Sequence, residues 1–226
     1  MVKVETDVCN TSGQSEQYRL VTQVFSPEGT LVTAVESTEK IAANTSKKFS
    51  QTTQSLQNLQ LWQPEHPALY KVISQLYKGN LLLDRDETIF GFRWFEWTAD
   101  RGFFLNGKHL YFKGANVHQD QAGWGDAVTE SAMRRDVQMM KEAGFELIRG
   151  SHYPHAPAFS KACDEEGMLF WSEAPFWGIG GFSPDGYWNS SAYPVDEKYT
   201  ANFEASALQQ LEEMIRIHRN HPSIVV

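Results

Sequence analysis

The sequence has 226 residues, enough for one large domain or for two domains of roughly 100–150 residues each. Apolar residues make up 41% and include 7 Trp, 8 Tyr and 14 Phe, so the chain can bury a core and is not of the disordered class. The net charge of −8 would repel phosphate backbones, which argues against a nucleic-acid-binding protein. No apolar run approaches the roughly 18–20 residues of a membrane span, so no membrane partner is expected.

The two cysteines and the N-terminus say little about the cellular compartment. Cys9 and Cys163 fall in segments of different character, which argues against a disulfide framework. The opening residues lack the apolar stretch of a signal peptide. Because the first methionine need not be the natural start, both the cytoplasm and the periplasm stay open.

Residues 1–95 contain short apolar runs separated by turn sequences, which predicts an antiparallel, immunoglobulin-like β-sandwich of about seven strands. Ser26-Pro27-Glu28-Gly29 is a good turn sequence, Gly79-Asn80 is another, and no helical stripe interrupts the series. The expected strands cover residues 18–25, 31–35, 47–53, 59–62, 70–77, 81–83 and 88–94.

From residue 96 onward the pattern changes to an alternation of strand and helix. Asn106-Gly107 lies between two apolar runs and predicts a two-residue hairpin turn with φ > 0 at both positions. The expected helices are one capped by Thr129 and ended by Gly144, one opened by Pro157 and ended by Gly167, and one over 203–218 with Phe203, Ala207, Leu208, Leu211 and Ile215 on its inner face. Strands are expected at 147–148, 168–171 and 224–226.

Strand–helix repetition builds a parallel sheet, and a closed (β/α)8 barrel needs about 250 residues. Residues 96–226 would supply about half of the eight units, so we expect the N-terminal half of a TIM barrel in a truncated chain. The first and fourth strands would then lack neighbours, and a second copy of the chain could pair with them to form a homo-oligomer. We expect the residues that face the empty interior to be Val117, Ile148, Phe170 and Val225.

Polar and aromatic residues cluster where the parallel strands should end. Asn116, His118 and Asp120 follow the first strand, residues 149–155 follow the second, and residues 173–177 follow the third. In a parallel barrel these carboxyl ends of the strands build the active site. The sequence therefore predicts one side of a polar, aromatic-lined pocket.

Several ordered motifs between about residue 58 and the end of the chain resemble family 2 glycoside hydrolases, the β-galactosidase, β-glucuronidase and β-mannosidase group. They are Leu61-Trp62-x-Pro64, Pro67-x-Leu69-Tyr70, Gly91-Phe92-Arg93, Phe104-Leu105-Asn106-Gly107-Lys108, Lys113-Gly114-Ala115-Asn116-Val117-His118, Ile148-Arg149-Gly150-Ser151-His152-Tyr153-Pro154, Cys163-Asp164-Glu165-Glu166-Gly167 and Arg219-Asn220-His221-Pro222-Ser223-Ile224. Val117 and Gln119 depart from the residues that many relatives carry, basic and acidic respectively, so galactoside, glucuronide and mannoside all stay open as substrates.

The resemblance implies a retaining glycosidase that removes a terminal β-linked sugar from an oligosaccharide or glycoside, with an acid/base carboxyl and a nucleophile about 5–5.5 Å apart. In that family the acid/base Glu follows the Asn-His-Pro-Ser-Ile run in an Asn-Glu pair, and the nucleophile lies at the end of strand seven. Both are expected beyond Val226, so the chain itself is expected to be inactive. No cofactor or metal is expected.

The resemblance also implies roles for the two histidines at the strand ends. His118 and His152 match positions that hydrogen-bond sugar hydroxyls next to the scissile bond. The alternative is that they brace the backbone of their loops. A zinc triad of His118, His152 and His155 is a further alternative, although the histidines lack helical ligand spacing.

The remaining candidates each have a structural alternative. Asp120 is a hydrogen-bond acceptor for a sugar hydroxyl or for an arginine, and Asn116 contacts either substrate or backbone. Arg149 needs a carboxylate partner if it is buried. We expect it to hold the residues that line the pocket in place without touching the substrate itself. Glu173 either supports the missing acid/base or forms a plain salt bridge. Asp120 and Glu173 could also form a catalytic pair, but only the fact that both are carboxylic acids supports this alternative.

Aromatic residues of the long segment 175–200 are candidates for stacking on a sugar ring. Trp177 is assigned to substrate binding, and Phe176 and Trp188 share its alternative, which is packing beneath a long loop. A different class of function, a non-catalytic carbohydrate-binding or structural module, also stays open.

Overall fold

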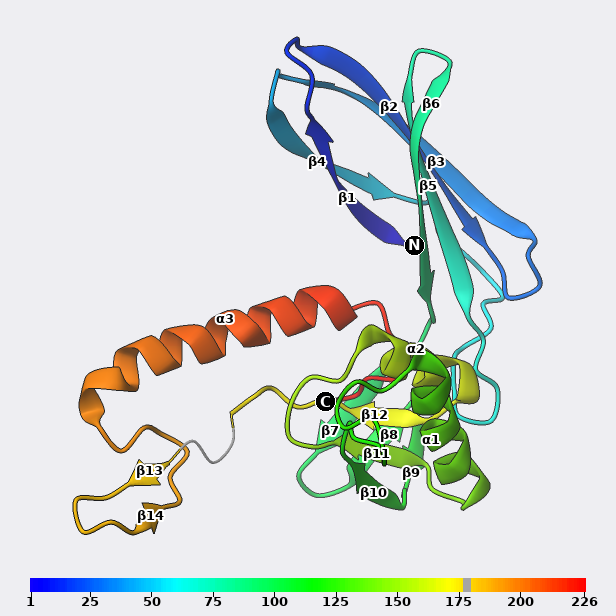
Figure 1. Cartoon of the computed structure of the whole chain (residues 1–226). Helices are drawn as coiled ribbons and strands as arrows, with labels where there is room; N and C mark the ends of the chain where they lie inside the picture. The colour runs from blue at the N-terminus through cyan, green and yellow to red at the C-terminus, as the bar shows by residue number, and fades with distance from the viewer. Residues whose placement is uncertain (177–179) are drawn as a thin grey trace. The chain divides into compact units, whose positions relative to one another are not determined.

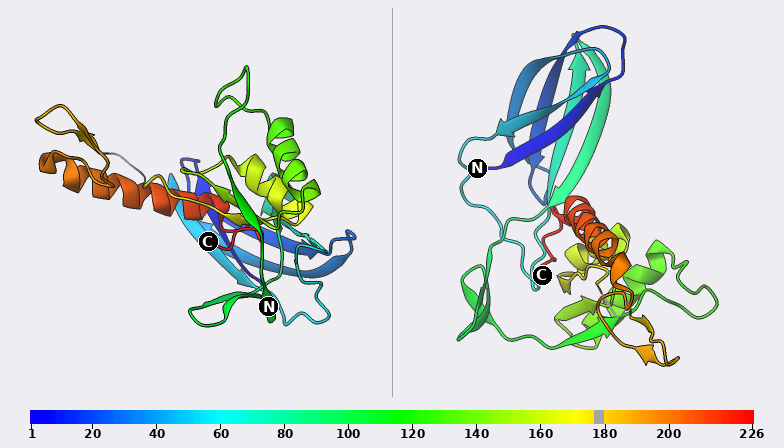
Figure 2. Two further views of the ribbon diagram at one scale, coloured as in Figure 1. Left: turned by 90° about the horizontal axis from the view of Figure 1, so that it is seen from below. Right: turned by 90° about the vertical axis from the view of Figure 1, so that its left-hand side faces the viewer.

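The computed structural model describes residues 1–176 and 180–226 and divides into two compact units. The first unit comprises Met1–Leu61 and Ala68–Phe92, and the second comprises Trp62–Pro67 and Arg93–Val226. Figure 1 labels the elements of both units, and Figure 2 shows the same ribbon from two further directions. The segment Trp62–Pro67, which the sequence had grouped with the sandwich, packs with the second unit.

The first unit is a sandwich of two antiparallel sheets, visible as two layers of strands in Figure 2. One sheet has the order β3-β2-β5-β6 and the other pairs β1 with β4. The strands are β1 (Lys3–Asn10), β2 (Glu16–Phe25), β3 (Leu31–Ile41), β4 (Thr45–Thr52), β5 (Tyr70–Lys78) and β6 (Leu81–Phe90).

The core of this unit follows from the two-residue repeat of its strands. In β2 every second residue from Tyr18 to Val24 is buried, because alternate side chains of a strand point to opposite faces. Residues of both sheets meet in one cluster, in which Val8 from β1 and Phe49 from β4 pack with Leu20 from β2. This burial of alternating apolar residues holds the two layers together.

Three strand expectations for the first unit were wrong. Residues 81–83 and 88–94 are not separate strands, because β6 is continuous across the polar stretch between them. β6 lies at the end of its sheet and is exposed along most of its length, so its centre does not need apolar residues. Residues 59–62 form only an isolated bridge, Leu61 to Phe92, and β1 had no strong apolar run to reveal it.

The second unit begins with a small antiparallel sheet of β7 (Phe95–Thr98), β8 (Gly102–Leu105) and β9 (Lys108–Leu110). The predicted hairpin turn is confirmed: Asn106 has φ 52° and Gly107 has φ 78° between β8 and β9. The Asn106 side chain also ties this turn to the segment Trp62–Pro67, since its amide donates to the Trp62 carbonyl at 3.0 Å.

A three-stranded parallel sheet follows, in the order β10-β11-β12, with helices α1 and α2 beside it (Figure 1). The elements are β10 (Gly114–Val117), α1 (Glu130–Glu142), β11 (Leu147–Gly150), α2 (Pro157–Glu166) and β12 (Leu169–Trp171). The predicted Thr129 cap is confirmed, since its side chain accepts from the Ala132 N–H, and Gly167 ends α2 in the left-handed conformation. A parallel bridge from Phe170 to Ile224 adds the beginning of a fourth strand.

The core of the second unit lies between this sheet and the two helices. Met133 and Val137 of α1 and Phe159 of α2 pack there against Ile148 and Phe170, which are both 0% exposed. Our expectation that Ile148 and Phe170 face an empty barrel interior was therefore wrong. Val117 also contacts this core, and Val225 is buried. Because side chains alternate along a strand, Arg149 and Trp171 take the opposite face of the sheet.

The C-terminal region contains β13 (Gly181–Phe182), β14 (Trp188–Asn189), a 3-10 turn (Glu197–Tyr199) and α3 (Thr200–His218). The expected inner face of α3 is covered only in part by residues that the structure describes: Phe203 and Ala207 are partly buried, and the rest of the face is exposed. Leu208 is 68% exposed and Ile215 is 54% exposed, and His218 is the buried residue of the helix. The helix also starts three residues before the predicted position. None of the described helices combines the length and the hydropathy needed to cross a bilayer.

The end of α2 provides a test of the packing in the second unit. A Cβ on Gly167 would clash with the carbonyl oxygen of Pro64, whereas a Cβ on Gly144, which follows α1 with φ 81°, would meet no atom within 4 Å. Both Gly→Ala changes introduce left-handed strain of about 1 kcal/mol. We expect Gly167→Ala to lower the free energy of unfolding by about 3 kcal/mol and Gly144→Ala by about 1 kcal/mol, as measured by urea denaturation. Equal losses would contradict the close approach of Pro64 to α2.

Candidate functional site

The parallel register brings the predicted site residues to one edge of the sheet. Asn116 in β10 is opposite Arg149 in β11, and Arg149 is opposite Trp171 in β12. Since the three strands run in the same direction, the segments that begin at His118, Ser151 and Ser172 all leave from their carboxyl ends. This edge is where a parallel α/β fold places its ligands.

Arg149 is the centre of the polar cluster at this edge. Its Nη2 lies 2.6 Å from Glu173 Oε2, in an ion pair whose two side chains are 33% and 20% exposed. Its Nη1 donates to Asn116 Oδ1 at 3.4 Å and to Ser151 Oγ at 3.3 Å. The guanidinium thus links residues from all three strand ends, and a partly buried charge is compensated by its carboxylate.

His152 is held between the two members of this ion pair. Its Nδ1 lies 3.1 Å from Arg149 Nη2 and 3.3 Å from Glu173 Oε1. A guanidinium can only donate and a carboxylate can only accept, so the proton on Nδ1 decides which neighbour the ring bonds to. Both oxygens of Glu173 therefore lie close to a basic side chain, Oε2 to Arg149 and Oε1 to His152.

His118 completes the group from the end of β10. Its ring centroid lies 5.3 Å from that of His152, with an interplanar angle of 70°. His118 is exposed and His152 is partly buried, with a 22% exposed side chain. The structure therefore brings together Asn116, His118, Arg149, His152 and Glu173, five of the seven predicted site residues.

The other two predicted residues are not part of this contact network. Asp120 is exposed, and it forms no hydrogen bond or ion pair with any residue in the ranges 1–176 and 180–226, so the arginine partner considered for it is not seen. Trp177 lies outside the described residues. Phe176 stacks on Phe203 at 5.6 Å, and Trp188 meets Phe182 edge-on at 5.4 Å, so each has an aromatic neighbour to pack against.

His155, the third histidine of the possible zinc triad, is directed into the core. It is 3% exposed, and its ring lies 4.9 Å from Phe159 and 5.9 Å from Phe170. Burial lowers its pKa, because the low-dielectric surroundings disfavour the charged imidazolium. No group of three or more His, Cys, Asp or Glu side chains within the described part of the chain is placed to hold a metal ion.

Sequence reasoning missed one cluster, which joins Asp164 of α2 to the segment after α3. This 3% exposed carboxylate accepts from the Ser223 backbone N–H at 3.0 Å and contacts the His221 ring. Arg93 donates to the carbonyls of Pro222 and Ile224 at 3.0 and 2.6 Å. The sequence shows both segments as motifs, Cys163–Gly167 and Arg219–Ile224. The contact between them spans more than 50 residues, and no local pattern encodes it.

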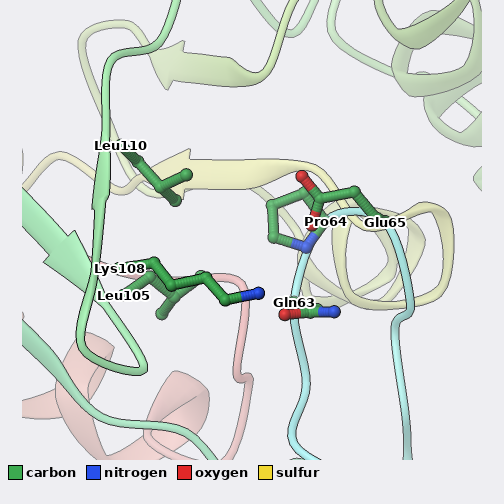
Figure 3. Close-up of a pocket in the computed structure, with 6 residues that line it drawn as sticks. All are labelled: Gln63, Pro64, Glu65, Leu105, Lys108 and Leu110. Atoms are coloured by element: carbon green, nitrogen blue, oxygen red, sulfur yellow. The ribbon is translucent and has the colours of Figure 1, made fainter.

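A small pocket of about 160 Å³ occurs elsewhere in the second unit (Figure 3). Its lining residues are Gln63, Pro64, Glu65, Leu105, Lys108 and Leu110. None of them belongs to the loops that follow β10, β11 or β12. We therefore do not assign this pocket to the candidate site.

The two buried histidines predict a pH-dependent stability. Burial lowers the pKa of His155, and burial together with the neighbouring His221 lowers that of His218, from the ordinary value of 6.5. As pH falls below about 6.5, the unfolded chain takes up protons that the folded chain does not, so the free energy of unfolding decreases. We expect a smaller loss between pH 7.5 and 5.5 for His155→Asn than for the unsubstituted chain, measured by urea denaturation at each pH.

The exposed His109 provides the control for this experiment. His109→Asn should retain the pH dependence of the unsubstituted chain. A His155→Asn variant with an unchanged loss of stability would show that the buried imidazole is not responsible.

Comparisons with known proteins agree with the two-unit architecture. Residues 1–93 match the family model "Glycosyl hydrolases family 2", and residues 98–226 match "Glycosyl hydrolases family 2, TIM barrel domain". These matches support the expected sandwich and TIM-barrel fold types. That the second unit is half of a barrel stays a prediction.

Individual relatives include enzymes named for two different sugars. The chain is 35% identical over 224 residues to a β-glucuronidase of Bacteroides fragilis, covering 97% of this chain and 31% of that protein. It is 33% identical over 207 residues to a β-galactosidase of Thermoanaerobacter pseudethanolicus, covering 91% of this chain and 25% of that protein.

Among solved structures, a β-glucuronidase of Bacteroides uniformis superposes with a TM-score of 0.84 and 34% identity, covering 99% of this chain and 25% of that one. The chain thus spans about a third or less of the length of these relatives. Since a family model matches more than half of its residues, the chain belongs to glycosyl hydrolase family 2.

Proposed function

We propose that residues 1–226 supply the β-sandwich and the N-terminal half of the TIM barrel of a retaining β-glycosidase, which hydrolyses a terminal β-linked sugar. The observation that carries this proposal is the cluster of His118, His152, Arg149 and Glu173 at the carboxyl edge of a parallel sheet in a family 2 chain. Relatives named β-glucuronidase and β-galactosidase support glycoside hydrolysis as the activity.

In this proposal the two histidines bind the sugar. Imidazole nitrogens can donate to or accept from hydroxyl groups, and His118 and His152 present theirs side by side at the strand ends. Arg149 and Glu173 orient the His152 ring through hydrogen bonds to its Nδ1, in the way that hydrogen-bond partners orient the histidine ligands of metal sites. Asn116, Asp120 and Trp177 are the further residues that we assign to substrate contact.

The catalytic carboxylates come from elsewhere in the longer enzyme. A retaining glycosidase needs one carboxyl that keeps a proton and a second that attacks the sugar carbon. Both oxygens of Glu173 are already engaged by neighbouring side chains, Oε2 by Arg149 at 2.6 Å and Oε1 by His152 at 3.3 Å. We therefore propose that residues beyond Val226 supply both the acid/base and the nucleophile.

The 226-residue chain alone should not hydrolyse glycosides, because in this proposal the carboxylate pair comes from other residues of the longer enzyme. The purified chain and a full-length enzyme that contains it are assayed with aryl β-galactoside, β-glucuronide and β-mannoside. We expect turnover only by the full-length enzyme, and its preference among the three identifies the sugar. Turnover by the short chain that is lost in Asp120→Asn or Glu173→Gln would contradict the proposal. An inactive full-length enzyme that still binds sugars would indicate a binding module instead.

In the full-length enzyme, His118→Ala and His152→Ala should each lower kcat/KM by about 10–1,000-fold, or roughly 1.4–4 kcal/mol of transition-state stabilisation. Steady-state kinetics on the preferred aryl glycoside measure this loss, and the melting temperature should change little. His109→Ala, at an exposed histidine in β9, is the matched control. A loss of activity that is fully explained by unfolding would assign both site histidines to a structural role.

A further inference from the structure

We propose that Gln119 and Tyr153 are positioning residues, which tie the loop after β10 to the loop after β11 and thereby hold His118 in place. The inference rests on the proposed function, since it concerns how the sugar-binding histidines keep their arrangement.

The link between the two loops consists of two hydrogen bonds in opposite directions. The backbone N–H of Gln119 donates to the hydroxyl oxygen of Tyr153 at 3.0 Å. The backbone N–H of Ala156 donates to the side-chain oxygen of Gln119 at 3.1 Å. Gln119 therefore contacts the second loop at two points, three residues apart.

Tyr153 is itself anchored to the core of the second unit. Its ring stacks on the buried His155 with centroids 5.4 Å apart and an interplanar angle of 21°. His155 in turn contacts Phe159 and Phe170 of that core. Packing of the ring against His155 thus holds the Tyr153 hydroxyl in place.

The His118 backbone is held on one side by Val117, whose carbonyl accepts from the Ser151 N–H at 3.0 Å, and on the other side by this link. Within the described ranges, the His118 side chain makes no hydrogen bond, and its ring contacts are with His152 at 5.3 Å and Tyr153 at 6.3 Å. It is the residue immediately before Gln119, so the bonds of Gln119 fix the backbone from which His118 projects. A displacement of about 1 Å at such a contact can reduce the rate roughly 100-fold.

The chemistry of the two bonds predicts which substitutions are tolerated. Ala156 requires only an acceptor oxygen, which Glu retains and Leu lacks at position 119. Tyr153→Phe keeps the ring that stacks on His155 and removes the acceptor for the Gln119 N–H.

The test uses the full-length enzyme and its preferred aryl β-glycoside. Gln119→Leu and Tyr153→Phe should each lower kcat about 10-fold or more, with a smaller change in KM, because the contact to be lost is strongest in the transition state. Gln119→Glu should restore kcat to within about threefold of the unsubstituted enzyme. Gln138→Leu, which removes a glutamine that donates from α1 to Glu166, is the matched control and should leave kcat unchanged.

A double-mutant cycle asks whether the link acts through His118. If it does, Gln119→Leu should have little further effect on kcat in a His118→Ala background. A full 10-fold effect in that background, or failure of Gln119→Glu to restore activity, would overturn the inference. If His118→Ala alone leaves kcat/KM unchanged, the proposed role of His118 fails instead, so the two failures are distinguishable.

Discussion

The arrangement at the strand ends depends on one ion pair, between Arg149 in the central strand of the parallel sheet and Glu173 after the next strand. A guanidinium in a partly buried position needs a carboxylate, and this need draws the segment after β12 toward β11. The same guanidinium reaches Asn116, Ser151 and the ring of His152, so five side chains from three strand ends share one hydrogen-bonded group. The orientation of the His152 ring is therefore coupled to charge compensation in the sheet.

Local chemistry was sufficient to predict the turns and helix ends from the sequence. The Asn106-Gly107 turn, the Thr129 cap and the glycine that ends α2 each depend on a few neighbouring residues. The grouping of site residues was also accessible, because parallel strands bring their carboxyl ends to the same edge. Contacts between distant segments were not. Asp164 meets Ser223 only because α2 lies beside the last strand, which no pattern within α2 reveals.

The errors share a physical origin in the direction that side chains take. In β11 and β12 both faces of the strand carry large residues, so composition could not decide whether Ile148 or Arg149 faces the helices. In α3 a regular apolar stripe predicted an inner face, yet Leu208 and Ile215 are exposed because the described residues provide no surface that covers them. A periodic pattern identifies an element, and its burial depends on what is packed against it.

The polar centre of β6, which hid that strand from pattern recognition, has a second effect. β6 ends its sheet, and four successive charged residues, Asp84–Glu87, occupy its middle. A strand from another molecule that paired along this edge would strip water from those charges, at a cost greater than the new backbone hydrogen bonds return. The charges of β6 thus disfavour the addition of a further strand at this edge of the four-stranded sheet, and with it edge-to-edge aggregation.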